Sequence, residues 1–137
     1  LFDCHLEFDG NVVVDFPLHC EGSENSVVNI LGEFEVNGDL WFEVGEVKAI
    51  GVISGRNILI ENQSLLCGMV NGTNVHLHGN MLIHPNCSID GFANNLILQG
   101  GFIEVLGTID GLGEIKFFGS EFVALQGEII EILSLFV

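Results

Sequence analysis

The amino-acid sequence predicts an all-β protein, a parallel β-solenoid (β-helix) of about six or seven coils with three short strands per coil. The main observation is a repeated phrase, in which an apolar residue is followed by Ser, Asn or Asp and then by Gly. Its five copies recur at nearly constant spacing and end at Gly38, Gly55, Gly72, Gly91 and Gly111. Apolar runs follow each copy in a constant order. A period of about 18 residues is too short for repeats of paired helices and fits one solenoid coil.

Each coil begins with the repeated phrase, which predicts a short strand that ends at a tight corner. A corner of this kind favours a residue with positive φ, which Gly adopts freely and which Asn or Asp tolerate. The apolar residues of the phrase point to the interior in this prediction. They form one buried ladder, which contains Ile53, Val70, Ile89 and Ile109.

Two further segments complete each predicted coil. The second segment follows the phrase directly and occupies 39–42, 57–60, 74–77, 95–98 and 114–117. The third segment follows another polar or Gly break and occupies 46–50, 64–67, 81–84, 102–106 and 122–125. The Val, Ile, Leu and Phe of these runs suit a pleated sheet. Strands of successive coils would then stack about 4.8 Å apart.

The chain of 137 residues is expected to form a single domain, with the solenoid in residues 31–137 and an irregular first coil or cap in residues 1–30. The separation of Gly10 from Gly38 is clearly longer than one coil, and residues 21–25 resemble a loop. The alternative is an array of antiparallel β-hairpins, because the copies around these two glycines also suit two-residue hairpin turns. A local hairpin rule, however, predicts no long-range period.

The rungs resemble those of known β-helices. The phrases Ser88-Ile89-Asp90-Gly91 and Thr108-Ile109-Asp110-Gly111 are similar to turns of right-handed parallel β-helices of the pectin-lyase-like kind. The Gly-rich rungs are also similar, more weakly, to those of bactofilins, which are small β-helical filament formers. The resemblance covers about residues 30–127 and implies a fold rather than an activity, because this fold is shared by unrelated functions.

The charge of the chain limits the classes of partner. Nineteen Asp and Glu residues stand against three Lys and Arg, which gives a net charge of −16. Nucleic acid is excluded, because phosphate binding requires basic clusters. No stretch of eighteen apolar residues predicts a membrane span. The apolar content of 48% is high for a solenoid, so some apolar side chains are expected to face outward. The candidates flank buried residues in the runs 58–60, 96–98 and 117–118.

Two residue pairs are candidate metal ligands, and no other cofactor is expected. Asp90 and Asp110 occupy equivalent corners of successive coils, so their carboxylates would stack closely enough to recruit Ca²⁺. His76 and His78 lie on one face of a predicted strand, a spacing that suits a transition metal. A solvated pair of histidines is the simpler interpretation.

The cysteines and glycosylation triplets bear on the compartment. Cys4 and Cys20, and likewise Cys67 and Cys87, are about one coil apart, so each pair is a candidate disulfide, with free buried thiols as the alternative. Three triplets fit the N-glycosylation pattern, and their acceptors would be Asn62, Asn71 and Asn86. With an even number of cysteines, they favour an extracellular, cell-surface or virion location.

No catalytic motif is present, so the chain is not expected to be an enzyme. The function predicted instead is that of a structural module, a homo-oligomer that self-associates into a filament, fibre, spike or surface assembly. The alternative is an adhesin-like or tailspike-like module that binds a glycan or protein along one solenoid face. The apolar C-terminal segment is the expected assembly joint, and the residues assigned to it are Ile129, Ile130, Ile132, Leu133, Leu135, Phe136 and Val137.

Overall fold

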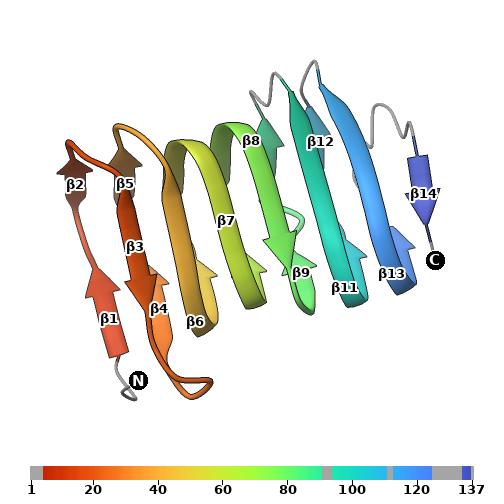
Figure 1. The fold of residues 1–137 in the computed structure, drawn as a ribbon, viewed down its shortest axis with the longest axis horizontal. Helices are drawn as coiled ribbons and strands as arrows, with labels where there is room; N and C mark the ends of the chain where they lie inside the picture. The colour runs from red at the N-terminus through yellow and green to blue at the C-terminus, as the bar shows by residue number, and fades with distance from the viewer. Residues whose placement is uncertain (1–4, 91–93, 111–112, 125–133, 137) are drawn as a thin grey trace.

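The computed structural model describes residues 5–90, 94–110, 113–124 and 134–136. In this part of the chain there is no helix, and the fourteen strands form a parallel β-solenoid of about six turns (Figure 1). The coils follow one another along a single axis, from β1 at one end to β14 at the other. The predicted fold class is confirmed.

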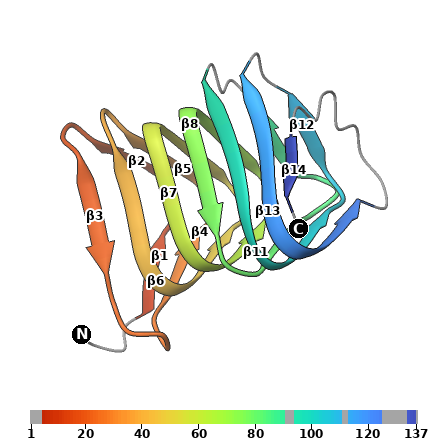
Figure 2. The same cartoon turned by 45° about the vertical axis from the view of Figure 1, so that its right-hand side comes forward.

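The strands of the first coil are short, and the later coils combine long strands with very short ones. In chain order they are β1 (His5–Phe8), β2 (Asn11–Val14), β3 (Leu18–Glu21), β4 (Val27–Ile30), β5 (Glu33–Val36), β6 (Leu40–Ala49), β7 (Val52–Leu66), β8 (Met69–His78), β9 (Met81–Ile83), β10 (Ser88–Asp90), β11 (Asn95–Val105), β12 (Thr108–Asp110), β13 (Glu114–Ala124) and β14 (Ser134–Phe136). The long strands β6, β7, β8, β11 and β13 lie side by side on one face (Figure 2).

Every strand pairing in the described residues is parallel, which excludes the hairpin array. The first coil consists of β1, β2 and β3, which pair in register with β4, β5 and β6 of the second coil. Residues 22–26 form the loop between these two coils and lengthen the first one. Gly10 therefore overlies Gly32, and not Gly38.

The corners differ from the prediction at Gly55 and Gly72. Both glycines lie inside strands, β7 and β8, which continue around the bend, and neither has a positive φ. In the described residues a positive φ occurs at Gly10, Gly38, Gly79 and Asn62. A different reason explains the glycine at position 72: a Cβ there would lie only 2.9 Å from Cδ1 of Ile58. In the middle turns, the prediction of three separate strands per coil is therefore wrong, because the strands there are continuous and bent.

The core is a set of aligned apolar columns inside the coils. The predicted ladder is confirmed, and it runs in register through Val12, Phe34, Ile53, Val70, Ile89 and Ile109. From Phe34 onward its members are at most 1% exposed. A second column faces it from the long strands and contains Cys20, Phe42, Ile60, Leu77 and Leu98. Burial of these side chains from water is the main stabilising contribution of the fold.

Two stacks of similar residues, one of glycines and one of Asp39 with three asparagines, lie at the corners. Gly10, Gly32, Gly51 and Gly68 follow one another at one corner, where a Cβ on any of the last three would lie well inside van der Waals contact with the preceding glycine's carbonyl oxygen. A second stack begins the long strands. In it Asn57 Nδ2 donates to Asp39, Asn74 Nδ2 donates to Asn57, and Asn95 Nδ2 donates to Asn74, over 2.8, 2.6 and 3.4 Å. The hydrogen bonds of this second stack satisfy side-chain polar groups that the bend brings close together.

Candidate functional site

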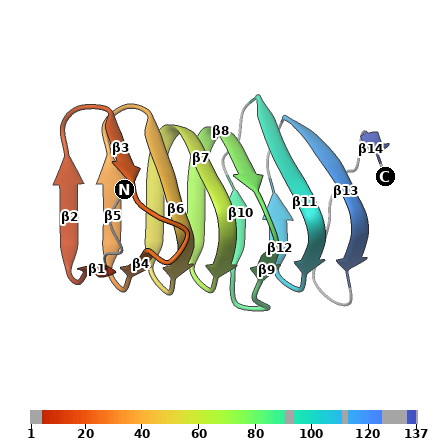
Figure 3. The same cartoon turned by 60° about the horizontal axis from the view of Figure 1, so that its bottom comes forward.

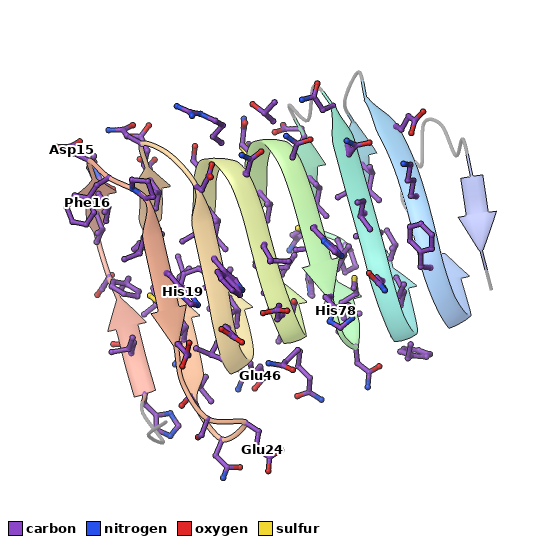
Figure 4. All side chains as sticks on the ribbon, in the orientation of Figure 1. Asp15, Phe16, His19, Glu24, Glu46 and His78 are labelled. Carbon is purple, nitrogen blue, oxygen red and sulfur yellow. The ribbon has the colours of Figure 1, made fainter. Side chains whose placement is uncertain are left out.

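The outward face of the long strands carries the clearest concentration of chemically active side chains. Its central column runs in register through His19, Trp41, Leu59, His76, Ile97 and Lys116. Leu59 and Ile97 confirm that some apolar side chains of the doubly apolar runs face outward. Figure 4 shows His19 on β3 and His78 on β8 pointing away from the same face.

His19 forms a cluster with two glutamates at the start of this face. Its Nε2 atom lies 3.1 Å from Oε1 of Glu43 and 3.9 Å from Oε2 of Glu21. Glu21 and Glu43 are directly opposite each other on β3 and β6, and His19 is two residues before Glu21 on the same side of its strand. One ligand atom from each of the three side chains lies within 4.8 Å of the other two. In the described residues no other group of three His, Cys, Asp or Glu side chains meets this condition.

Trp41 holds the imidazole of His19 in place. The two rings are stacked, with their centroids 3.9 Å apart and an interplanar angle of 7°. The indole Nε1 of Trp41 donates a 2.8 Å hydrogen bond to Oε2 of Glu61 in the next coil. A depression of about 180 Å³ lies beside the stack and is lined by Pro17, Leu18, His19, Asp39 and Trp41. His19 is therefore oriented by packing as well as by its contacts with Glu21 and Glu43.

Sequence reasoning missed this cluster, although one signal was present. The copy of the repeated phrase in the first coil, at Phe8-Asp9-Gly10, lies over Gly32 and Gly51 rather than over the phrase glycine Gly55. Aligning it with the other copies therefore identifies no partner for His19. The spacing from Gly10 to Gly32 would have aligned it, because the same spacing places His19 over Trp41 and Glu21 over Glu43.

The predicted pair His76 and His78 lies on the outward face of β8. The ring centroids are 6.1 Å apart and nearly perpendicular, and Nε2 of His76 lies 3.1 Å from Oε1 of Gln99. In the part of the chain that the structure describes, no Cys, Asp, Glu or further His completes a three-ligand set with them. A transition metal at this pair stays a prediction.

Asp90 and Asp110 are directly opposite each other on β10 and β12, as their equivalent positions predicted. Asn71 of β8 is the neighbour of Asp90 on its other side. Oδ1 of Asp90 is buried and has no hydrogen-bond partner among the described residues. The side chain of Asp110 lies outside the described residues, so Ca²⁺ binding at this corner stays a prediction.

Of the two alternatives for Cys67 and Cys87, the structure has free thiols. Cys87 is 1% exposed, and burial, together with the nearby Cys67, raises its pKa from 9.0 to about 12. The pairing of Cys4 with Cys20 involves residue 4, which lies outside the described residues.

Alkylation is expected to distinguish the two thiols. At pH 8 a group with this pKa is a thiolate in about one molecule in 10,000, so Cys87 should react with iodoacetamide far more slowly than the partly exposed Cys67. The raised pKa also means that the unfolded chain loses this proton first, and the solenoid should lose stability as the pH rises from about 9 to about 12. Mass spectrometry of labelled peptides measures the first effect, and urea unfolding against pH measures the second. Equal labelling rates, or an unchanged alkaline slope in Cys87→Ala, would contradict the assignment.

The remaining predicted positions are the glycosylation acceptors and the assembly joint. The three acceptors of the glycosylation triplets, Asn62, Asn71 and Asn86, are exposed, although Asn62 Nδ2 donates a 2.6 Å hydrogen bond to the carbonyl of Val44. In the expected assembly joint, β14 pairs with β13 and so extends the sheet of the long strands by one strand. The joint residues 129–133 and 137 lie outside the described residues.

Comparison with known proteins gives no relative for this chain. No family model, no curated protein and no solved structure matches it. Among the described residues, no helix is long and apolar enough to cross a membrane.

Proposed function

We propose that this chain is a non-enzymatic structural module whose solenoids associate end to end into a filament or fibre. The observation that carries the proposal is that each strand of the first coil is paired on one side only. Within the described residues, β1 pairs only with β4, β2 only with β5 and β3 only with β6. Figure 3 shows β2 at the end of its row, with β5 as its neighbour. All three strands therefore present an edge that another parallel coil would fit.

The side chains of the first coil support the same proposal. Phe8, Val12, Val14, Leu18 and Cys20 continue the apolar columns but are only partly buried, whereas their partners in the second coil are buried. A further coil placed on this end would bury them as the second coil buries its own columns. Phe16 and Val13, which are 63% and 57% exposed, lie beside the same end (Figure 4 for Phe16).

A second copy of the chain is the occupant that the geometry favours. Successive coils are paired in parallel from β1 to β13. The same arrangement of strand edges and apolar columns is therefore repeated from coil to coil along the molecule. A head-to-tail contact between identical solenoids does not close on itself and therefore generates an open filament. The similarity of the rungs to those of bactofilins, which form filaments, agrees with this proposal.

Electron microscopy and sedimentation of Val13→Pro test the proposal. The carbonyls of Gly10 and Val14 accept hydrogen bonds from Glu33 and Asn37, so by alternation the N–H of Val13 points to the open edge. Proline removes this edge donor without removing a bond between coils. We expect filaments of the wild-type protein that lengthen with concentration, at least tenfold less sedimentable material for Val13→Pro, and wild-type behaviour for the control Val13→Ala.

Uniform monomers of the wild-type protein at all concentrations would overturn the proposal. The alternative function, a module that binds a glycan or protein along one face, would then become the better interpretation. Circular dichroism of both variants checks that the β-sheet content is unchanged, so that a loss of filaments reports on the edge rather than on folding.

A further inference from the structure

We propose that His19, Glu21 and Glu43 form a binding site for a divalent transition-metal ion of the Zn²⁺ type. The site goes beyond the proposed assembly function and does not depend on it. It lies on the outward side of the first and second coils, where Figure 4 shows His19 on the face of β3. The three side chains would supply one imidazole nitrogen and two carboxylate oxygens, and a fourth position would remain for water or another ligand.

The ligand atoms are close to the separation that such an ion requires. Around a tetrahedral zinc ion with bonds of about 2.0 to 2.2 Å, neighbouring ligand atoms are about 3.4 Å apart. Nε2 of His19 is 3.1 Å from Oε1 of Glu43 and 3.9 Å from Oε2 of Glu21, and all three ligand atoms lie within 4.8 Å of one another. Small side-chain rotations of the two partly exposed glutamates would complete the arrangement.

The electrostatics of the cluster favour a cation. Glu21 and Glu43 are directly opposite each other on adjacent strands, where like charges repel. Among the described salt bridges, neither carboxylate has a Lys or Arg partner. A divalent ion would replace the repulsion between the glutamates by attraction to both, and it would bind the neutral imidazole at the same time.

The imidazole is already oriented for this role. Stacking on Trp41 fixes the plane of the His19 ring, and Glu61 fixes Trp41 through the indole hydrogen bond. Supporting contacts of this kind orient ligands in metal sites and reduce the entropy lost on binding. An imidazole ligand also distinguishes the site from one for Ca²⁺, which is bound by oxygen atoms.

Trp41 provides a direct probe, because it is the single tryptophan of the chain and it stacks on His19. The experiment is a titration of the wild-type protein with Co²⁺, followed by tryptophan fluorescence, with Zn²⁺ as competitor and EDTA to reverse binding. We expect saturable quenching that Zn²⁺ prevents and Ca²⁺ does not. Absence of saturable quenching, or equal competition by Ca²⁺, would overturn the proposal.

Matched variants assign the ligands, with Zn²⁺ binding followed by calorimetry. His19→Gln and Glu43→Gln should each weaken binding by about tenfold or more. His5→Gln is the control, because it removes an exposed histidine of the first coil that belongs to no three-ligand group among the described residues. Unchanged affinity in His19→Gln, or an equal loss in His5→Gln, would overturn the assignment. Circular dichroism verifies that each variant keeps the β-sheet spectrum of the wild-type protein.

Discussion

Replacement of Ile89 by Asp is expected to prevent the solenoid from folding. Ile89 is fully buried in the apolar ladder, with Val70 and Ile109 as its register neighbours in the adjacent coils. The substitution removes apolar burial worth about 2 to 5 kcal/mol and places an unpaired carboxylate among aliphatic side chains, which costs several kcal/mol more. Together these losses approach the whole free energy of unfolding of a small domain, about 5 to 15 kcal/mol. Far-UV circular dichroism and limited proteolysis measure the outcome.

Ile50→Asp is the matched control for this prediction. Ile50 has the same side chain but is 62% exposed, so the carboxylate remains in water and the change in stability should be small. An intact β-sheet spectrum and wild-type protease resistance for Ile89→Asp would contradict the register of the ladder. Unfolding of both variants would show that the assay reports added negative charge rather than burial.

Gly51→Ala is expected to destabilise the solenoid by about 3 kcal/mol or more. Gly51 stacks on Gly32 at the glycine corner, and a Cβ there would lie well inside van der Waals contact with the carbonyl oxygen of Gly32 and 2.9 Å from that of Leu31. Both obstacles are backbone atoms, so relief requires the two coils to separate, and separation lengthens the hydrogen bonds between them. The midpoint of urea unfolding measures the effect.

Gly55→Ala separates close packing from the general cost of replacing glycine. A Cβ at Gly55 would meet the side chain of Ile58 at 3.3 Å and the carbonyl oxygen of Gly38 at 3.4 Å, and small shifts accommodate both contacts. We expect a loss below about 1 kcal/mol for this variant. Similar midpoints for Gly51→Ala and Gly55→Ala would show that the glycine corner tolerates a side chain.

The repeat allowed one buried ladder of the interior to be predicted residue by residue. Ile53, Val70, Ile89 and Ile109 were expected to form one ladder, and they do. This inference succeeded because a strand alternates its side chains between two faces, so an apolar residue at a constant place in each coil always points inward. The role given to Gly72 was wrong for a related reason, since a glycine in a repeat can mark a close approach of two coils as well as a positive φ.

The outward face was much harder to predict. His76 and His78 were recognisable because they are close in sequence, whereas His19 and Glu43 are far apart in the chain and belong to coils of different length. No local pattern specifies how many residues a coil contains, because loops such as residues 22–26 add length without changing the strands. Partners on the surface are therefore hidden until the register of each coil is known.

The recurring apolar and glycine positions are enough to establish a parallel solenoid with an apolar interior, because they leave few other ways to bury those side chains. The residue register between neighbouring coils became known only from the folded molecule. That register brings His19, Glu21 and Glu43 close together beside the Trp41 ring. The physical reason is that hydrogen bonds between coils form at any register, and the register that the chain adopts depends on packing of the entire stack.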